Sequence, residues 1–137
     1  MSIQTEQNKA TVIRFNRECL EKGNKSSLNE LVAEDVINYA AAEGMPNGKE
    51  SFSFFLKNVL HQGFSDIEVE IFEQLAEGDL VSTRKIIRGT HTGEIAGILP
   101  TGRKVEIKVI DIIRLRDGQY VEHWGMSNFD QVLRGLS

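Results

Sequence analysis

Alternation of apolar and charged residues between Lys104 and Arg116 limits the possible folds of this chain more than any other feature. The segment reads KVEIKVIDIIRLR, with apolar residues in nearly every odd position and charged residues in most even ones. A period of two is typical of a β-strand with one buried face. The dipeptide Asp117-Gly118 follows at once and favours a tight hairpin turn. We therefore predict that this strand pairs antiparallel with the segment 119–129.

Helical patterns precede this hairpin, and further strand patterns lie between them. Apolar residues recur at helical spacing in two segments, and Gly23 and Gly63 stand where helices commonly end. Ser27 and Glu30 form a capping-box pattern that predicts another short helix. The three predicted helices span residues 9–22, 26–36 and 49–62, and the further strands span 67–75 and 80–93. We predict the α+β class: a single domain over residues 1–137, with a curved antiparallel sheet covered on one face by three helices.

Composition excludes several classes of partner. Acidic side chains number 20 against 16 basic ones, and no basic cluster stands out, so we expect no nucleic-acid binding. The polar start of the chain and the lack of an apolar run of about 20 residues indicate no membrane segment. Cys19 is the only cysteine, which forbids an internal disulfide and favours a reduced, cytoplasmic setting.

Asp111 interrupts the apolar row of the strand 104–116. If the odd positions face the interior, this carboxylate is buried among apolar side chains, and burial raises the pKa of a carboxyl group. Such groups are candidate acids or bases. The alternatives are that Asp111 pairs with an arginine such as Arg84, caps a loop, or is turned outward by a bulge.

His91 is a second candidate, because it lies in the segment GTHTG between two glycines. A histidine can transfer protons near neutral pH, and the glycines would let a ligand approach the backbone closely. The alternative is an ordinary turn residue. His61 and His123 show no spacing typical of metal ligands, so we expect no metal site. Phosphate-binding and dinucleotide-binding motifs are absent from the sequence, and we expect no cofactor.

The segment EHWGMSNFD, residues 122–130, brings the only tryptophan into a strand. By alternation, Glu122, Trp124, Met126 and Asn128 point to one face. An indole needs burial for its ring and an acceptor for its N–H, so this row is either a pocket wall or a half-buried sheet face. The Asn128 amide can form hydrogen bonds but cannot act as an acid or base near neutral pH.

Several strings in this order resemble the SnoaL-like polyketide cyclases and ester cyclases of the nuclear transport factor 2-like superfamily. They are LVAEDVINYAAAEGMPNGKES, FSDIEVE, AEGDLVSTRKIIRGTHTGEIAGILPTGRKV, RDGQYVEHW and the C-terminal VLRGLS. The most specific part is GTHTGE followed by PTG and, after the Asp-Gly hairpin, EHW. The resemblance covers nearly the whole chain.

The resemblance implies a cone-shaped α+β barrel that encloses a deep apolar pocket, commonly in a homodimer. It also implies a ring closure by intramolecular aldol condensation without metal or cofactor, on a small hydrophobic molecule. The family uses an aspartate four residues after the tryptophan, where this chain has Asn128. Many members have a histidine in the first loop, where this chain has Tyr39. Both departures remove a group that titrates near neutral pH.

Three hypotheses follow from these residues. The chain is a cyclase-type enzyme whose proton transfer has moved to Asp111, with His91 or Tyr39 orienting the substrate. Alternatively, it is a binder of hydrophobic small molecules without catalysis, or an interaction module. For the first hypothesis we predict Asp111 and His91 as catalytic residues. The predicted substrate-binding residues are Tyr39, Arg84, Glu122, Trp124, Met126 and Asn128.

Overall fold

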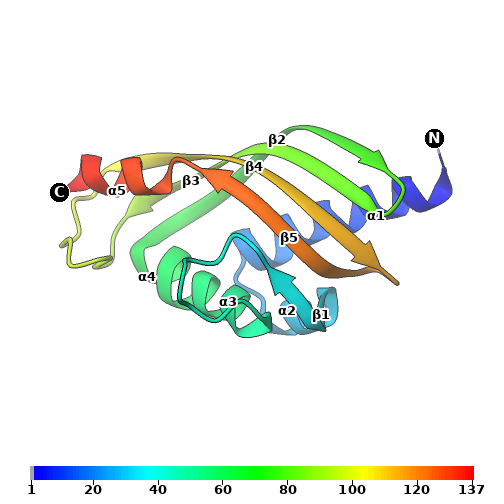
Figure 1. Ribbon diagram of the computed structural model, residues 1–137. Helices are drawn as coiled ribbons and strands as arrows, with labels where there is room; N and C mark the ends of the chain where they lie inside the picture. The colour runs from blue at the N-terminus through cyan, green and yellow to red at the C-terminus, as the bar shows by residue number, and fades with distance from the viewer. Residues whose placement is uncertain (1) are drawn as a thin grey trace.

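A curved sheet of five strands forms one layer of the molecule, and helices cover one of its faces (Figure 1). The computed structural model describes residues 2–137. The strand order is β1-β5-β4-β3-β2, in which β1 runs parallel to β5 and all other neighbours are antiparallel. The strands are β1 (Val32–Asn38), β2 (Phe64–Glu77), β3 (Leu80–His91), β4 (Lys104–Arg116) and β5 (Gln119–Ser127).

Two of the helical segments pass from α-helix into π-helix without a break. The helices are α1 (Ile3–Phe15) with η1 (Asn16–Glu21), α2 (Lys25–Leu31), α3 (Lys49–Phe54) with η2 (Phe55–Leu60) and α4 (His61–Gly63), and α5 (Phe129–Leu136). The predicted α+β class is therefore confirmed, and the two termini lie at opposite ends of the molecule (Figure 1). Among residues 2–137, no helix combines the length and hydrophobicity that a membrane crossing requires.

The sheet differs from the prediction at one edge. We predicted that the second helix continues to Val36, but α2 ends at Leu31 and residues 32–38 form β1. Val32 and Val36 are β-branched and fully buried, which suits a strand better than the end of a helix. Because β1 lies parallel to β5, the sheet is mixed rather than purely antiparallel, and it does not close into a barrel.

The hairpin that joins β4 and β5 has the predicted turn. Asp117 and Gly118 both have positive φ, 53° and 76°, as the two central residues of a type I′ turn require. The odd residues of β4 face the helices: all are buried except the half-buried Val109. The inward direction of Asp111 is thereby confirmed, and its side chain belongs to the face that packs on the core.

A β-bulge in β5 changes the face of every residue that follows it. Next to the turn, Leu115 pairs with Tyr120, and both are buried, but the following pairs are Arg114 with Glu122 and Ile113 with His123. The extra residue is accommodated between Tyr120 and Glu122. One added residue moves the rest of a strand to the opposite face. His123 therefore points inward, and Trp124 points outward.

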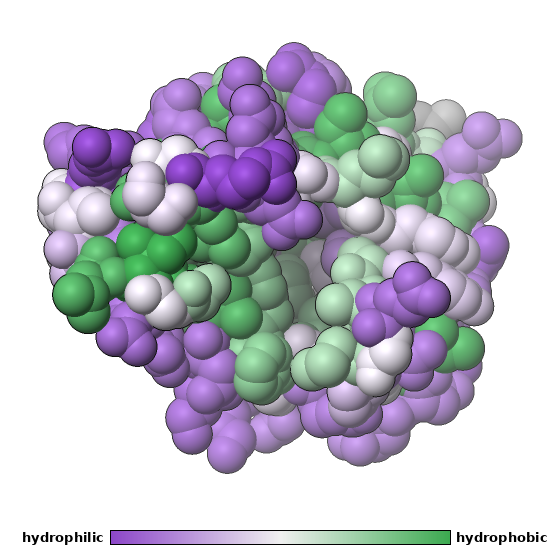
Figure 2. Space-filling model, turned by 60° about the vertical axis from the view of Figure 1, so that its left-hand side comes forward, coloured by the Kyte–Doolittle hydropathy of each residue, from purple (hydrophilic) through white to green (hydrophobic). Residues whose placement is uncertain are grey.

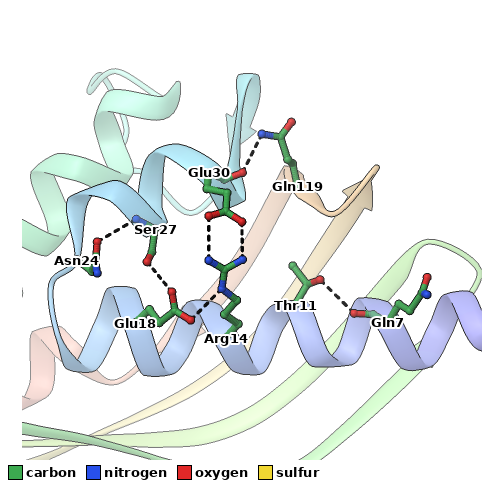
Figure 3. A network of polar contacts seen from close by, with 8 residues as sticks. All are labelled: Gln7, Thr11, Arg14, Glu18, Asn24, Ser27, Glu30 and Gln119. Atoms are coloured by element: carbon green, nitrogen blue, oxygen red, sulfur yellow. Dashed lines mark hydrogen bonds and ion pairs between the residues drawn. The ribbon is translucent and has the colours of Figure 1, made fainter.

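Arg14 links α1 to η1 and to α2 through its guanidinium (Figure 3). Its guanidinium donates two hydrogen bonds to Glu30, of 2.6 and 2.9 Å, and one of 2.8 Å to Glu18. Glu18 also accepts a bond from Ser27, and the Glu30 carbonyl accepts one of 2.9 Å from Gln119. These contacts set the position of α1 across the inner face of the sheet.

Candidate functional site

A buried ion pair lies at the centre of the inner face. Asp111 on β4 and Lys85 on β3 are 5% and 4% exposed, and Lys85 Nζ is 3.2 Å from Asp111 Oδ2. Lys85 Nζ also donates a 2.7 Å hydrogen bond to Oδ1 of Asn16, which has no exposed surface. The ion pair is therefore held between the sheet and the first turn of η1.

The charge state of Asp111 follows from two opposing effects. Burial raises its pKa, but the attraction of Lys85 together with the contacts from His123 outweighs burial, so the pKa lies below the ordinary value of an aspartate. The expectation of a raised pKa is thus wrong, because the sequence does not show that a lysine is buried beside the carboxylate. Arg84 is not its partner either, since it lies on the outer face and binds Glu73.

His123 on β5 is the second neighbour of Asp111, with 3.7 Å between its Nε2 and Oδ2 of the carboxylate. Its Nδ1 is 2.8 Å from Oδ1 of Asn38, an oxygen that also accepts the backbone N–H of Ala40 at 3.0 Å. Because Oδ1 is an acceptor, Nδ1 must carry a proton. In neutral His123 the lone pair is then on Nε2, which faces Asp111.

Among residues 2–137, two buried side-chain oxygen atoms on this face have no hydrogen-bond partner. They are Oδ1 of Asp111 and Oγ1 of Thr83, the residue directly opposite Asp111 on β3. Buried polar atoms without partners are uncommon, and each one costs free energy. With Oδ2 engaged by Lys85 and His123, Oδ1 is the atom of Asp111 that is free to accept a proton or to bind a polar group.

His91 lies far from this group. It has no exposed surface, and its Nδ1 accepts a 3.2 Å hydrogen bond from the backbone N–H of Thr101, while Nε2 has no partner. Eight residues along β3 separate it from Thr83, a span of about 26 Å in an extended strand. The structure therefore does not bring His91 and Asp111 together.

The glycines of GTHTG serve the packing of the chain itself. A Cβ on Gly93 would lie 1.9 Å from the backbone oxygen of Gln62, and one on Gly89 would lie 3.2 Å from Cβ of Phe64. His91 also exchanges backbone hydrogen bonds with Gly102, the glycine of PTG, and with the next residue, Arg103. The close approach expected for a ligand is thus made by the protein's own backbone.

Most residues of the row that begins with Glu122 lie on the outer face of the sheet, whereas Asp111 lies on the inner face. Glu122 accepts a 2.6 Å bond from Arg114, and Trp124 stacks on Tyr39 with ring centroids 5.2 Å apart. Met126 is 82% exposed. The bulge in β5 is the reason, since simple alternation from Tyr120 would have placed this row inside. The structure therefore does not place these residues in one cavity with Asp111.

Asn128 and Tyr39 have structural contacts of their own. Asn128 is the residue before α5, and its Oδ1 accepts a 2.9 Å hydrogen bond from the backbone N–H of Lys108. Tyr39 follows β1 and is 51% exposed, and its pKa is raised by desolvation and by the neighbouring Glu122 carboxylate. Neither residue contacts Asp111, and their substrate-binding roles remain predictions.

A hollow with hydrophobic borders opens at the end of the molecule that lies on the left of Figure 1 (Figure 2). In α5, the Phe129 ring lies 6.4 Å from the rings of both Phe55 and Phe64. Several hydrophobic side chains that pack on the core stay half-buried. Among them are Phe55, Val59, Ile98, Val109, Phe129, Val132 and Leu133. A pocket that extends from this hollow to Asp111 remains a prediction.

The sequence-based prediction missed Lys85, His123, Asn16 and Asn38. Lys85 was detectable, because it occupies the buried parity of LVSTRKIIRGTH together with Val81, Thr83 and Ile87. No local signal marks His123, since the bulge reverses its parity. Asn16 and Asn38 join the site only through contacts between distant segments. Within residues 2–137, no three His, Cys, Asp or Glu side chains converge as a metal site requires.

Comparisons with known proteins agree with this architecture. The family model described as SnoaL-like polyketide cyclase matches residues 10–136. The nogalonic acid methyl ester cyclase of Streptomyces nogalater is 24% identical over 115 residues, which cover 83% of this chain and 86% of that protein.

Solved structures show the same fold. The crystal structure of IdmH, a putative polyketide cyclase from Streptomyces antibioticus, has a TM-score of 0.80 and 32% identity, and the match covers 95% of this chain and 98% of that one. A putative SnoaL-like polyketide cyclase from Jannaschia sp. CCS1 has a TM-score of 0.85 at 24% identity, with 100% and 96% covered.

Proposed function

Because the chain belongs to the SnoaL-like polyketide cyclase family, we propose that it catalyses a cofactor-independent, aldol-type ring closure on a small hydrophobic substrate. The observation that supports this most directly is Asp111, a buried carboxylate that is held ionised by Lys85 and whose Oδ1 has no partner. A buried ion pair is a costly element of a core. A buried carboxylate with one oxygen paired and the other oxygen free is a candidate for proton transfer.

The reaction needs one proton acceptor that also returns the proton. Oδ1 of Asp111 takes a proton from the carbon next to a substrate carbonyl, which leaves an enolate. The enolate carbon forms a bond to a second carbonyl carbon of the same molecule, and that carbonyl oxygen becomes an alkoxide. The alkoxide then takes the proton from Asp111, so the product is an isomer of the substrate and no atom is lost. His123 Nε2 lies 3.7 Å from Oδ2, the oxygen that does not take the proton.

The interior contributes enclosure and orientation. A substrate that enters through the hollow at the α5 end passes half-buried hydrophobic side chains of η2, β4 and α5. Such a surface binds rings and alkyl segments by shape, and a folded conformation of the substrate brings its reacting carbons together. Asp111 has almost no exposed surface, so binding must part the side chains that cover it.

Asp111→Asn tests the proposal. Nogalonic acid methyl ester, which gives the Streptomyces nogalater relative its name, is among the first substrates to try. We expect turnover to fall by at least about a hundredfold, because an amide cannot accept the proton, while substrate affinity changes only a few-fold. Conversion is followed by chromatography and affinity by calorimetry. Full turnover in this variant would eliminate Asp111 as the base.

Glu106→Gln is the matched control, because it makes the same change of acid to amide on the same strand but on the outer face. We expect its turnover to equal that of the wild type. If no substrate in a panel of poly-β-ketones is converted, but hydrophobic ligands raise the melting temperature, the chain is a binder without catalysis.

We also propose that the outer face of the sheet pairs with a second copy of the chain. Ile110, Ile112 and Met126 are 55%, 40% and 82% exposed on adjacent strands. Ion pairs with both signs of charge border this strip, among them Arg84–Glu73, Arg88–Glu106 and Arg114–Glu122. A two-fold interface brings one patch against itself, and a border with both signs can complement its own copy.

Light scattering tests the dimer. Ile110→Glu should convert a dimer to a monomer, because it places a charge in the centre of the apolar strip. Ile3→Glu, at a residue that is 78% exposed on α1, is the control and should leave the mass unchanged. A monomeric wild-type protein at micromolar concentration would rule out the dimer.

A further inference from the structure

We propose that Lys85 and Asn16 are positioning residues for Asp111: together they keep its carboxylate ionised and hold it by Oδ2, so that Oδ1 is the atom left for the substrate. This inference rests on the proposed function of Asp111 as the base. It assigns the site two further residues, neither of which contacts the substrate.

The first argument is the cost of the arrangement. Lys85 and Asp111 are both at least nine-tenths buried, and taking two charges out of water costs more than a surface ion pair returns. Apolar side chains of similar size would pack at this position without that cost. A structural role alone therefore gives no reason for the pair, whereas a base that must stay ionised inside an apolar core does.

The second argument is the local structure at Asn16. The α-helix changes to a π-helix at this residue, and π-helical turns occur frequently at functional sites. Both ends of the buried amide are engaged: Nδ2 donates to the carbonyl of Val12 at 2.8 Å, and Oδ1 accepts from Lys85 at 2.7 Å. Asn16 thus fixes the ammonium group from the side of the helices, as Asp111 does from the sheet.

The third argument is that few other charges reach Asp111. His123 on β5 approaches Oδ2, and the backbone of Gly125 lies directly opposite on the same strand. Tyr120 is buried below the site, and burial together with the Asp111 carboxylate raises its pKa well above the ordinary value. Burial raises the pKa of Cys19 on η1 to about 12. Tyr120 and Cys19 are therefore neutral at physiological pH, and Lys85 is the cation that pairs with Asp111.

NMR titration of the Asp111 side-chain carboxyl carbon tests the inference without any substrate. In Lys85→Met we expect a titration midpoint at least about one pH unit above that of the wild type, because burial then acts without its main compensation. Asn16→Leu should raise the midpoint by a smaller amount. Lys85→Gln is the second variant in case Lys85→Met does not fold, and the same rise is expected.

Arg88→Met is the matched control, because it removes a cation from the outer face of the same strand, and the midpoint should not move. An unchanged midpoint in a folded Lys85 variant would overturn the inference. A pH profile of kcat that stays unchanged while the NMR midpoint rises would count against Asp111 as the base rather than against its control by Lys85. Turnover that survives Asp111→Asn refutes instead the proposed function, and the titration still decides whether Lys85 controls Asp111.

Discussion

Two groups of charged residues in this protein make similar contacts in opposite surroundings. The Arg14 group on the helical layer joins one guanidinium to Glu18 and Glu30 in contact with solvent (Figure 3). The Lys85 group joins one ammonium to Asp111 and Asn16 inside the core. Contact distances are comparable, but water screens the first group and is excluded from the second.

The difference shows which group is structural. A solvated ion pair contributes little to stability and costs little to form, so the Arg14 group acts as a fastener between helices. A desolvated pair is expensive, and loss of either partner leaves an uncompensated charge in the core. The energetic consequences of substitution should therefore be far larger at Lys85 than at Arg14.

Lys85→Met should have the largest effect on stability, because it removes the cation of the buried ion pair. We expect the free energy of unfolding at neutral pH to fall by about 3 to 5 kcal/mol, because Asp111 is left buried without its main partner. Urea unfolding measures the change. The double variant Lys85→Met/Asp111→Leu should recover most of the loss, and a double variant as unstable as the single one would contradict this explanation.

The pH dependence of stability should change sign with the same substitution. In the wild type the pKa of Asp111 is lowered by folding, so its contribution is present above the unfolded value of about 3.9 and is lost as pH falls through the folded pKa. In Lys85→Met burial dominates and the folded pKa is raised, so the contribution of Asp111 should be largest below the unfolded value of about 3.9 and should be lost as pH rises through the folded pKa. Melting temperatures measured across the acid range distinguish the two slopes.

Asn16→Leu should have an intermediate effect, because it removes one hydrogen bond but no charge. We expect a loss of about 1 to 3 kcal/mol, the cost of a buried donor without its acceptor. Urea unfolding at neutral pH measures it. A loss as large as that of Lys85→Met would mean that the hydrogen bond to Asn16, rather than the charge of Lys85, dominates the stability of this group.

Arg14→Met should have the smallest effect. Its hydrogen bonds lower the pKa of both Glu18 and Glu30, so their contribution is present at neutral pH and is lost as pH falls through the folded pKa values. The difference in melting temperature from the wild type should therefore be small at pH 7 and should vanish in acid. High salt should reduce it as well, and insensitivity to salt would argue against a screened surface group.

The strand β4 shows how far local patterns lead. Its alternation placed Asp111 on the inner face, and the Asp-Gly dipeptide placed the hairpin, because both depend on residues next to each other in the chain. The pattern of β3 contains the same information for Lys85, which stands in the buried row. The ion pair follows once the two strands are known to be neighbours, with Thr83 opposite Asp111.

The strand β5 shows where local patterns stop. Alternation put Glu122 and Trp124 on one face, and the family resemblance favoured a pocket wall, but one extra residue after Tyr120 turned this row outward and turned His123 inward. A bulge depends on how two strands and their twist fit together, which no short segment encodes. The second difference, the strand β1, arises in the same way, since the edge of β5 offers Val32–Asn38 a partner.

Sequence alone predicts the α+β class, the strands β2 to β5 and the row of β4 that contains Asp111, because propensity and period act over a few residues. Tertiary structure decides which groups surround that carboxylate. Lys85, His123 and Asn16 come from three elements and meet only when the sheet curves over η1. The charge state of Asp111 is therefore a property of the folded chain, since it depends on burial and on partners far away in the sequence.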